Sequence, residues 1–161
     1  MVPSHAKESL PEFLTVAEAT LLNAKTKAAR VARKRPDALV VAADTLVALD
    51  GEALGKPADM DEAFAMLKRL SGRTHIVFSG VWLADGPTGR QLGFIAASRV
   101  KFRRMKPAEI REYIKRVDPL DKAGAYAAQR NEMNLIESVE GSYTNVIGLP
   151  MEPLAEALRE F

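Results

Sequence analysis

Two charged residues stand at the two ends of one predicted hairpin. Asp44 directly follows an apolar run, and Lys56 lies in a Leu-Gly-Lys-Pro segment; between them, hydrophobic residues flank Asp50-Gly51, a dipeptide typical of a two-residue type I′ turn. Because a hairpin brings its ends together, we expect Asp44 and Lys56 to be neighbours. A carboxylate that holds a metal or deprotonates water, beside an ammonium that neutralises phosphate oxygens, predicts chemistry on a phosphate-bearing substrate.

The same two residues have a structural interpretation. An Asp-Thr pair after a strand often closes a turn, and an ordinary surface ion pair contributes about 0–1 kcal/mol. The expected place of Asp44, at the end of a buried strand, is the edge where open α/β sheets bind ligands. Spacing alone leaves both interpretations of Asp44 and Lys56 open.

A second candidate segment spans 118–129, where small side chains surround Gly124 and the segment ends at Gln129. Small residues let the backbone approach a ligand closely, and the amide of Gln129 can donate to and accept from a base edge or a phosphate. A plain helix-to-strand loop accounts for the same composition. The glycine-bracketed turn at 141–150 could line the same groove or only support it.

Composition excludes several other kinds of site. The 161 residues contain no cysteine, which excludes disulfides, thiolate zinc sites and cysteine nucleophiles. The two histidines, His5 and His75, form no pattern typical of a metal site, and the sequence has no P-loop, dinucleotide fingerprint or nucleophile elbow. A net charge of +2, from 23 basic and 21 acidic residues, does not indicate nucleic-acid binding.

The sequence shows neither a membrane segment nor an export signal. Its apolar stretches are all shorter than the roughly 20 residues that span a bilayer, and 1–5 lacks the basic start and apolar run of a signal peptide. The 47% hydrophobic and 27% charged content is that of an ordinary globular domain. We therefore expect a cytoplasmic protein that does not act on membranes.

Helices and strands alternate along the chain. A helix is predicted from Thr15, with Glu18 completing a capping box, and its apolar face, beside which Lys27 lies, ends before Pro36. The apolar run at 38–43 favours a central strand covered on both faces. The remaining predicted elements are a hairpin over 46–54, a helix at 59–70, extended segments at 74–83 and 94–104 joined through 85–89, a helix from Pro107 and a C-terminal helix from Met151. This order predicts an α/β fold with a mixed sheet.

Taken in order, five segments resemble the Maf family, also called septum-formation-inhibitor-like proteins. The segments are Ala43-Asp44-Thr45, Gly55-Lys56-Pro57, Leu70-Ser71-Gly72-Arg73-Thr74-His75, Asp121-Lys122-Ala123-Gly124-Ala125-Tyr126 and Gly148-Leu149-Pro150. The resemblance extends over nearly the whole chain, and five ordered motifs are far more specific than any one of them. It implies the elongated, two-lobed fold with flanking helices that Maf proteins share with inosine triphosphate pyrophosphatases.

The resemblance also implies an activity. Maf proteins cleave a nucleoside triphosphate to the monophosphate and pyrophosphate with a divalent metal, Mg²⁺ or Mn²⁺, and the family suggests a homodimer. The Asp-Lys-Ala-Gly-Ala-Tyr segment is similar to that of the branch acting on dTTP and UTP. By motif, Asp44 resembles the catalytic acid, as general base or metal ligand, and Glu8 a second metal-handling residue. Lys56, Lys27 and Gln129 resemble substrate-binding residues.

One departure from the family pattern is large. Family members begin with a strand and a Ser-x-Ser-Pro-Arg-Arg loop that grips the triphosphate, and no Ser-Pro-Arg-Arg occurs in this chain. We therefore expect 1–161 to form a single, N-terminally truncated domain with an exposed edge of its central sheet. Reduced stability and weak or absent activity would follow, which leaves a second hypothesis: a nucleotide-binding regulator of septum formation without turnover.

Overall fold

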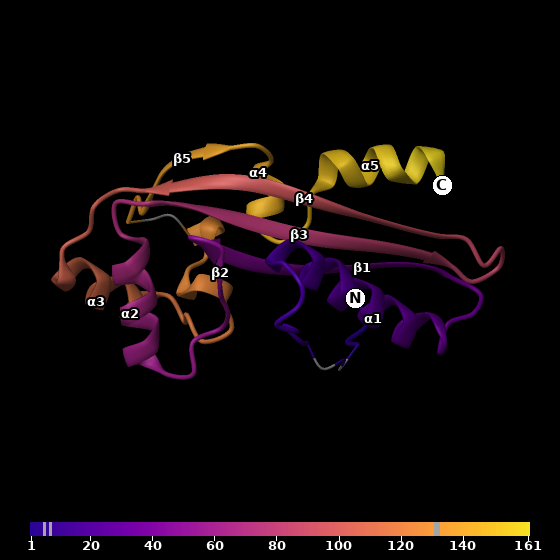
Figure 1. The fold of residues 1–161 in the computed structure, drawn as a ribbon, viewed down its shortest axis with the longest axis horizontal. Helices are drawn as coiled ribbons and strands as arrows, with labels where there is room; N and C mark the ends of the chain where they lie inside the picture. The colour runs from indigo at the N-terminus through magenta and orange to yellow at the C-terminus, as the bar shows by residue number, and fades with distance from the viewer. Residues whose placement is uncertain (5, 7, 131–132) are drawn as a thin grey trace.

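The computed structural model describes residues 1–4, 6, 8–130 and 133–161 (Figure 1). Long strands run through the molecule, with α2 and α3 at one end and α1 and α5 over the other. In chain order the elements are α1 (Val16–Ala32), β1 (Leu39–Leu49), β2 (Glu52–Leu54), α2 (Met60–Leu70), β3 (Thr74–Asp85), β4 (Gln91–Phe102), α3 (Pro107–Arg116), the 3-10 turns η1 (Ala123–Ala125) and η2 (Ala128–Arg130), β5 (Ile136–Glu140), α4 (Tyr143–Val146) and α5 (Met151–Glu160). The predicted α/β class and elongated shape are confirmed.

The five strands form one sheet in the order β2-β1-β3-β4-β5. Every pairing among the described residues is antiparallel, so the prediction of a mixed sheet is wrong. Two of the pairings, β1 with β2 and β3 with β4, join consecutive strands through short turns. Such connections allow only antiparallel pairing, because parallel neighbours need a long crossover.

Local signals in the sequence position the main elements. The Thr15 hydroxyl accepts a hydrogen bond from the Glu18 N–H, and the Glu18 carboxylate accepts one from the Thr15 N–H, which is the predicted capping box. Asp50 and Gly51 have φ angles of 54° and 83°, as a type I′ turn requires. These signals act over a few residues, and each predicted element boundary near them is confirmed.

Strand β1 differs from the prediction in length and coverage. It continues to Leu49, so Asp44 lies in the middle of the strand rather than after its end. Leu39 and Val41 are exposed, which means that only one face of this part of β1 is covered, whereas coverage of both faces was expected. Since β2 pairs with β1 only from Val47 onward, the described residues leave Asp44 bonded to β3 on one side and facing an open edge on the other.

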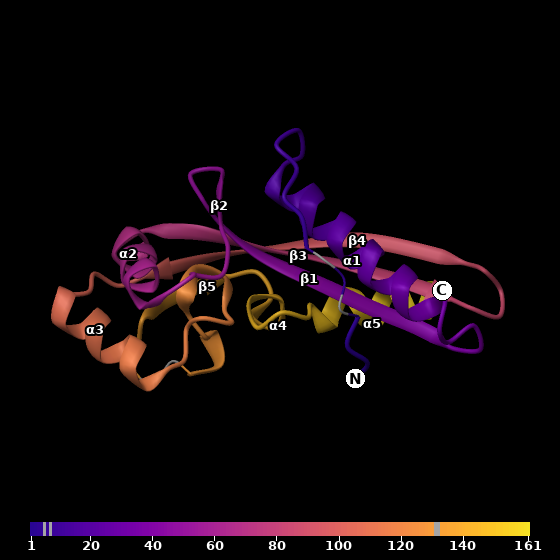
Figure 2. The same cartoon turned by 90° about the horizontal axis from the view of Figure 1, so that it is seen from below.

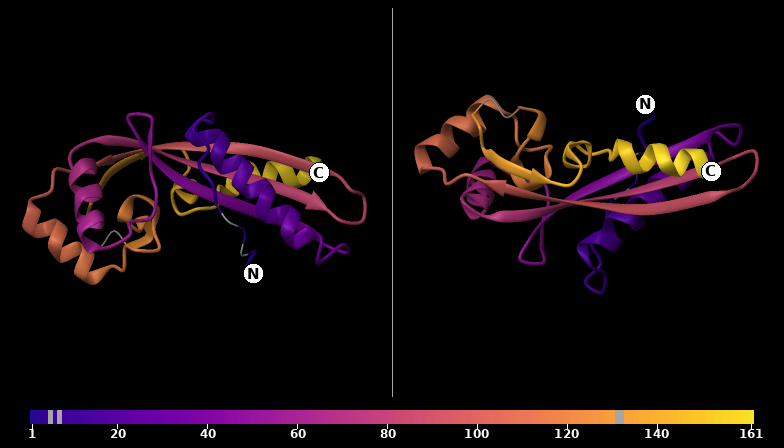
Figure 3. Two further views of the ribbon diagram at one scale, coloured as in Figure 1. Left: turned by 60° about the horizontal axis from the view of Figure 1, so that its bottom comes forward. Right: turned by 90° about the horizontal axis from the view of Figure 1, so that it is seen from above.

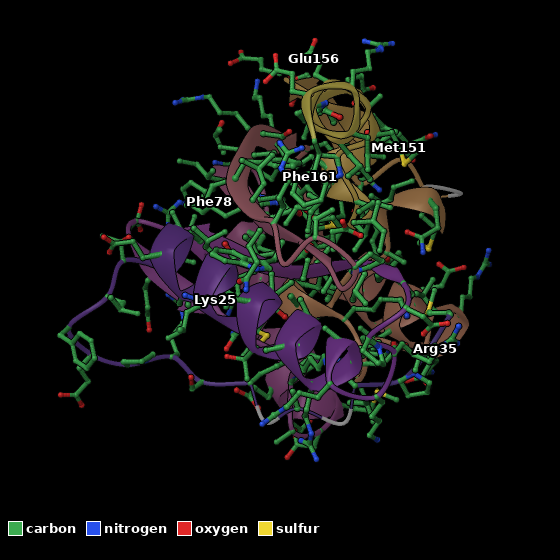
Figure 4. The ribbon with its side chains drawn as sticks, turned by 90° about the vertical axis from the view of Figure 1, so that its right-hand side faces the viewer. Lys25, Arg35, Phe78, Met151, Glu156 and Phe161 are labelled. Carbon is green, nitrogen blue, oxygen red and sulfur yellow. The ribbon has the colours of Figure 1, made fainter. Side chains whose placement is uncertain are left out.

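Helices α1 and α5 pack on opposite faces of the sheet (Figures 2 and 3). The view along the long axis shows α1, with Lys25, on one side of the strands and α5, with Glu156, on the other (Figure 4). At one end of the molecule, α2, α3 and the 123–130 loop close around a larger core that includes Leu67, Phe102 and Tyr113. We call this end the far lobe. In the part of the chain that the structure describes, no helix is both long and apolar enough to cross a membrane.

Candidate active site

A pocket of about 270 Å³ lies where α1, the open edge of β1 and the loops of the far lobe meet. All five residues singled out from the sequence line it: Glu8, Lys27, Asp44, Lys56 and Gln129. Its other lining residues carry no formal charge except Asp121 and Lys122. The pocket therefore has a charged part made of three acidic and three basic side chains, and a neutral part.

Asp44 is the most buried of the charged residues in the pocket, with 5% of its surface exposed. One carboxylate oxygen accepts a hydrogen bond of 2.6 Å from the Lys27 ammonium, and the other accepts one of 3.0 Å from the side-chain amide of Asn23. Both partners come from α1, one helical turn apart. A buried carboxylate needs such charge-assisted partners, because leaving it unpaired in the interior is costly.

Gly80 on β3 makes the approach of α1 to Asp44 possible. Gly80 is the direct strand partner of Asp44, and a Cβ atom built on it would lie 2.4 Å from backbone atoms of Thr20 and Leu21. No side chain fits at that distance, so only glycine lets the helix backbone rest against the sheet there. This contact sets the height of α1 above Asp44 and thereby the reach of Asn23 and Lys27.

Glu8 connects the two lysines of the pocket. Its carboxylate lies 2.8 Å from the Lys27 ammonium and 3.8 Å from that of Lys56. Burial alone would raise the pKa of Glu8, but the hydrogen bond with Lys27 and the charges of both lysines outweigh it and lower that pKa. Burial likewise acts to lower the pKa of Lys27, and the bonds to Asp44 and Glu8 reverse this and raise it. Lys27 is therefore held as a cation.

The hairpin brings Asp44 and Lys56 into one pocket but does not pair them with each other. Both residues line the same pocket, as expected from the hairpin. The ion-pair partner that the structure gives Asp44 is Lys27, however, and Lys56 pairs with Glu8 instead. The reason is that β2 leaves the edge of β1 before Asp44, so the ends of the hairpin diverge.

Comparison with known proteins places the chain in a family. The model of the family described as Maf-like protein matches residues 1–161. The chain belongs to the Maf family. It is 44% identical, over 96% of its length and 81% of the relative's, to a protein of Pelotomaculum thermopropionicum named dTTP/UTP pyrophosphatase. Proteins of the same name from Carboxydothermus hydrogenoformans and Salinibacter ruber are 41% and 43% identical, covering 100% and 97% of this chain and 86% and 77% of their own lengths.

The loop that carries the Maf motif at 121–126 is held in place by contacts with buried residues of the sheet and with the Gly55 backbone. Gly124, at φ 69°, packs against the Val47 side chain and donates its N–H to the Gly55 carbonyl at 3.0 Å. That bond joins the loop to the segment that carries Lys56. Tyr126, which lines the pocket, is bonded through its hydroxyl to Nε2 of the buried His75 at 2.9 Å.

His75 is a core residue of this Maf chain, with 1% of its surface exposed. Its ring packs edge-on against Phe102 and Tyr126, and burial lowers the pKa of His75 from 6.5 to about 4. Burial also raises the pKa of Tyr126 far above its usual value. Both groups are therefore neutral near pH 7, and they support the pocket loop without carrying charge.

Sequence reasoning missed Asn23 altogether. Its amide donates to Asp44 and to the Ser9 carbonyl, and its oxygen accepts from the Ser9 N–H at 3.0 Å, so it also fixes the segment that carries Glu8. A signal was available, because Thr20, Asn23 and Lys27 form a polar line on a helix face that is otherwise alanine-rich. Lys122 and Asp121 were noted only as parts of a motif, and they too line the pocket.

Two carboxylates of the pocket, those of Asp44 and Glu8, are placed to bind a divalent cation together with a substrate. Among the described residues, no group of three or more histidine or acidic side chains converges on one point. Asp44 and Glu8, however, direct oxygens at one shared cation, the Lys27 ammonium, at 2.6 and 2.8 Å. Mg²⁺ commonly binds through one or two carboxylates, with water and substrate phosphates completing its shell. This pair therefore fits the cation when a phosphate substrate is present.

Proposed function

We propose that this Maf protein hydrolyses nucleoside triphosphates, dTTP and UTP foremost, to the monophosphate and pyrophosphate. The observation that carries the proposal is the buried Asp44 carboxylate, bonded to Lys27 inside a pocket that holds two further lysines. Such an arrangement joins one proton acceptor to several cations, which is what attack on a polyphosphate needs. The names of the relatives, dTTP/UTP pyrophosphatase, support the substrate choice.

In the proposed reaction Asp44 accepts a proton from water. The water oxygen forms a bond to the α-phosphorus, the bond from that phosphorus to the bridging oxygen breaks, and pyrophosphate leaves with the electron pair. Asn23 keeps the Asp44 carboxylate oriented, since it donates to the oxygen that Lys27 does not contact. The proposed role of Asp44 thus depends on geometry that α1 supplies.

The lysines would neutralise the phosphate oxygens. Lys27 remains protonated because its carboxylate partners raise its pKa, and Lys56 is half-exposed and free to turn toward an incoming substrate. Each charge-assisted contact to phosphate contributes about 1.5–3 kcal/mol. Gln129, an exposed residue at the rim of the same pocket, would bind the substrate through its amide.

Asp44 and Glu8 are the residues that would hold a divalent metal, Mg²⁺ or Mn²⁺. A bound metal would neutralise charge on the phosphate oxygens and lower the pKa of a water molecule. For the residues themselves, the requirement is that Lys27 leaves its position between the two carboxylates and moves to the substrate. A homodimer and a cytoplasmic location, both implied by the family or by composition, stay predictions that light scattering and fractionation can measure.

The test is pyrophosphate release from UTP, dTTP and 7-methyl-GTP with Mg²⁺ or Mn²⁺. We expect wild-type turnover on UTP and dTTP, and a loss of about 10²–10⁴-fold in Asp44→Asn, because a general base contributes that much. The matched control is Asp50→Asn, the same chemical change at an exposed turn residue, where Asn-Gly preserves the type I′ turn.

Two results would contradict the proposal. A wild-type protein that releases pyrophosphate from none of the three nucleotides lacks the proposed activity. Full turnover in Asp44→Asn, with circular dichroism showing an intact fold, would remove Asp44 from the chemistry. Turnover confined to 7-methyl-GTP would retain the reaction and overturn the choice of substrate.

A further inference from the structure

One wall of the pocket is a short turn that stands on a buried polar network. The turn comprises 142–148 and includes α4; Val146, Ile147 and Gly148 face the pocket. Beneath it the sheet presents three hydroxyl groups, from Thr45 on β1, Ser79 on β3 and Ser98 on β4. We call Thr45, Ser79 and Asn145 the relay, because they connect this wall to the strand of Asp44.

Asn145 is the centre of the network and is completely buried. Its side-chain amide donates to the Val77 carbonyl at 3.0 Å and to the Ser98 hydroxyl at 2.9 Å. The Ser98 hydroxyl in turn donates to the Ser142 carbonyl at the start of the turn, at 2.9 Å. Asn145 thus bonds β3 and β4 at once, and an apolar residue in its place would leave buried polar groups without partners.

The hydroxyls of Thr45 and Ser79 complete the connection. They lie 2.7 Å apart; Ser79 is 3.3 Å from the backbone carbonyl of Asn145, and Thr45 is 3.4 Å from that of Gly148. The two hydroxyls have two protons for these three contacts. In either arrangement, one proton joins the hydroxyls and the other reaches a carbonyl of the turn. Strand β1, at the residue that follows Asp44, is therefore connected to the wall in both arrangements.

The wall itself suits the uncharged part of a nucleotide. The charged residues of the pocket come from the N-terminal segment, α1, β1 and the loops at Lys56 and at 121–122, and none comes from 142–148. Ile147 presents an exposed aliphatic side chain there. A triphosphate belongs with the lysines, so the sugar and base remain for the neutral side.

We propose that the Thr45–Ser79–Asn145 relay is a positioning device that fixes 146–148 as the binding wall for the nucleoside part of the substrate. The inference rests on the proposed function. Ser79 and Asn145 do not line the pocket and act through the wall, whereas Thr45 belongs to both. A displacement of 146–148 would weaken the contacts with the nucleoside and leave the contacts with the phosphates unchanged.

Ser79→Ala tests the relay, because it removes the middle hydroxyl without touching the substrate. We expect the KM for UTP to rise about three- to tenfold, the equivalent of one neutral hydrogen bond, with kcat within about twofold. Inhibition by inorganic tripolyphosphate, which has no nucleoside, should keep its constant. The Gly148 N–H, which donates to the backbone carbonyl of Asn145 at 3.0 Å, should exchange its hydrogen with solvent faster than in the wild type.

Ser71→Ala is the matched control. The Ser71 hydroxyl also bonds backbone, accepting from the Met105 N–H at 2.7 Å, but it lies in the far lobe away from the pocket. We expect a comparable loss of stability and an unchanged KM.

The outcomes separate the inference from the proposed function. A wild type without turnover on UTP or dTTP contradicts the proposed function before any variant is made. Given wild-type turnover, an unchanged KM in Ser79→Ala would overturn the relay. Equal losses for UTP and tripolyphosphate, or the same loss in Ser71→Ala, would overturn it as well, because the effect would then not be confined to the nucleoside wall.

Discussion

The two ends of the sheet are stabilised in different ways. The far lobe has one large core in which Leu67, Phe102 and Tyr113 are almost fully buried. At the other end the sheet separates two small clusters, one under α1 around Ala28 and one under α5 around Leu154. Helix α1 rests on the sheet mainly through alanines and the close approach at Gly80, so little apolar area is buried there.

The difference separates stability from chemistry. The lobe with the large core supplies most of the hydrophobic stabilisation, while the residues around Asp44 depend on backbone proximity and on polar contacts. A substitution in the far lobe should therefore lower stability more than activity, and one under α1 should do the reverse. Four substitutions or conditions test this contrast, ordered by their expected effect on stability.

Leu67→Ala should have the largest effect on folding. Leu67 is fully buried on α2, and removing such a side chain costs about 2–5 kcal/mol of unfolding free energy. Urea unfolding measures the loss, and the KM for UTP should stay near the wild-type value under conditions where the variant is folded. A folded variant with a KM for UTP well above that of the wild type would mean that the two ends of the molecule are coupled.

Acid should weaken the large core through His75. Its pKa is about 4 in the folded protein and about 6.5 when unfolded, so the unfolded state binds more protons between these values. The contribution of neutral His75 to the free energy of unfolding is fully present above pH 6.5. It is lost as pH falls toward 4, and the total loss is about 3 kcal/mol. In His75→Gln, which does not titrate, unfolding measured across this range should be less pH-dependent by that amount. An unaltered pH dependence would show that other groups cause it.

Gly80→Ala should affect activity more than stability. The added Cβ must displace α1, which costs about 1–3 kcal/mol as overpacking and moves Asn23 away from the Asp44 carboxylate that it orients. We expect a folded protein whose pyrophosphate release falls at least about tenfold, since small misplacements in a site have large effects. Gly55→Ala, where a Cβ meets nothing within 4 Å, is the control for stability. Wild-type activity in Gly80→Ala would show that the height of α1 does not matter.

Lys56→Met should have the smallest effect on stability. The Lys56–Glu8 pair is separated by 3.8 Å and both side chains are substantially exposed, so its loss should change the unfolding free energy by less than about 1 kcal/mol. The KM for UTP should nevertheless rise, and its dependence on salt should weaken. Lys101→Met removes an exposed pair with Glu137 and should leave the KM unchanged. Equal KM values in the two variants would exclude Lys56 from phosphate binding.

Much of the fold follows from short-range rules in the sequence. The Thr15 capping box, the Asp50-Gly51 turn and the apolar spacing of α2 and α3 each act within one element, and the structure has each where it was predicted. The antiparallel arrangement was missed, since a continuous apolar run indicates a strand without showing which neighbour it pairs with. The same limit explains why Leu39 and Val41 were expected to be covered.

For the site, the sequence by itself determined which residues belong together. The ordered motifs contain Asp44 and Lys56, and the resemblance to the Maf family added Lys27, Glu8 and Gln129; all five line one pocket. Only the tertiary structure decided which of these residues contact each other. Lys27 rather than Lys56 is the partner of Asp44, because β2 leaves the sheet edge and Gly80 lets α1 descend onto β3. Asn23 and the relay under 142–148 depend on the same kind of contact, between segments far apart in the chain, which no local pattern encodes.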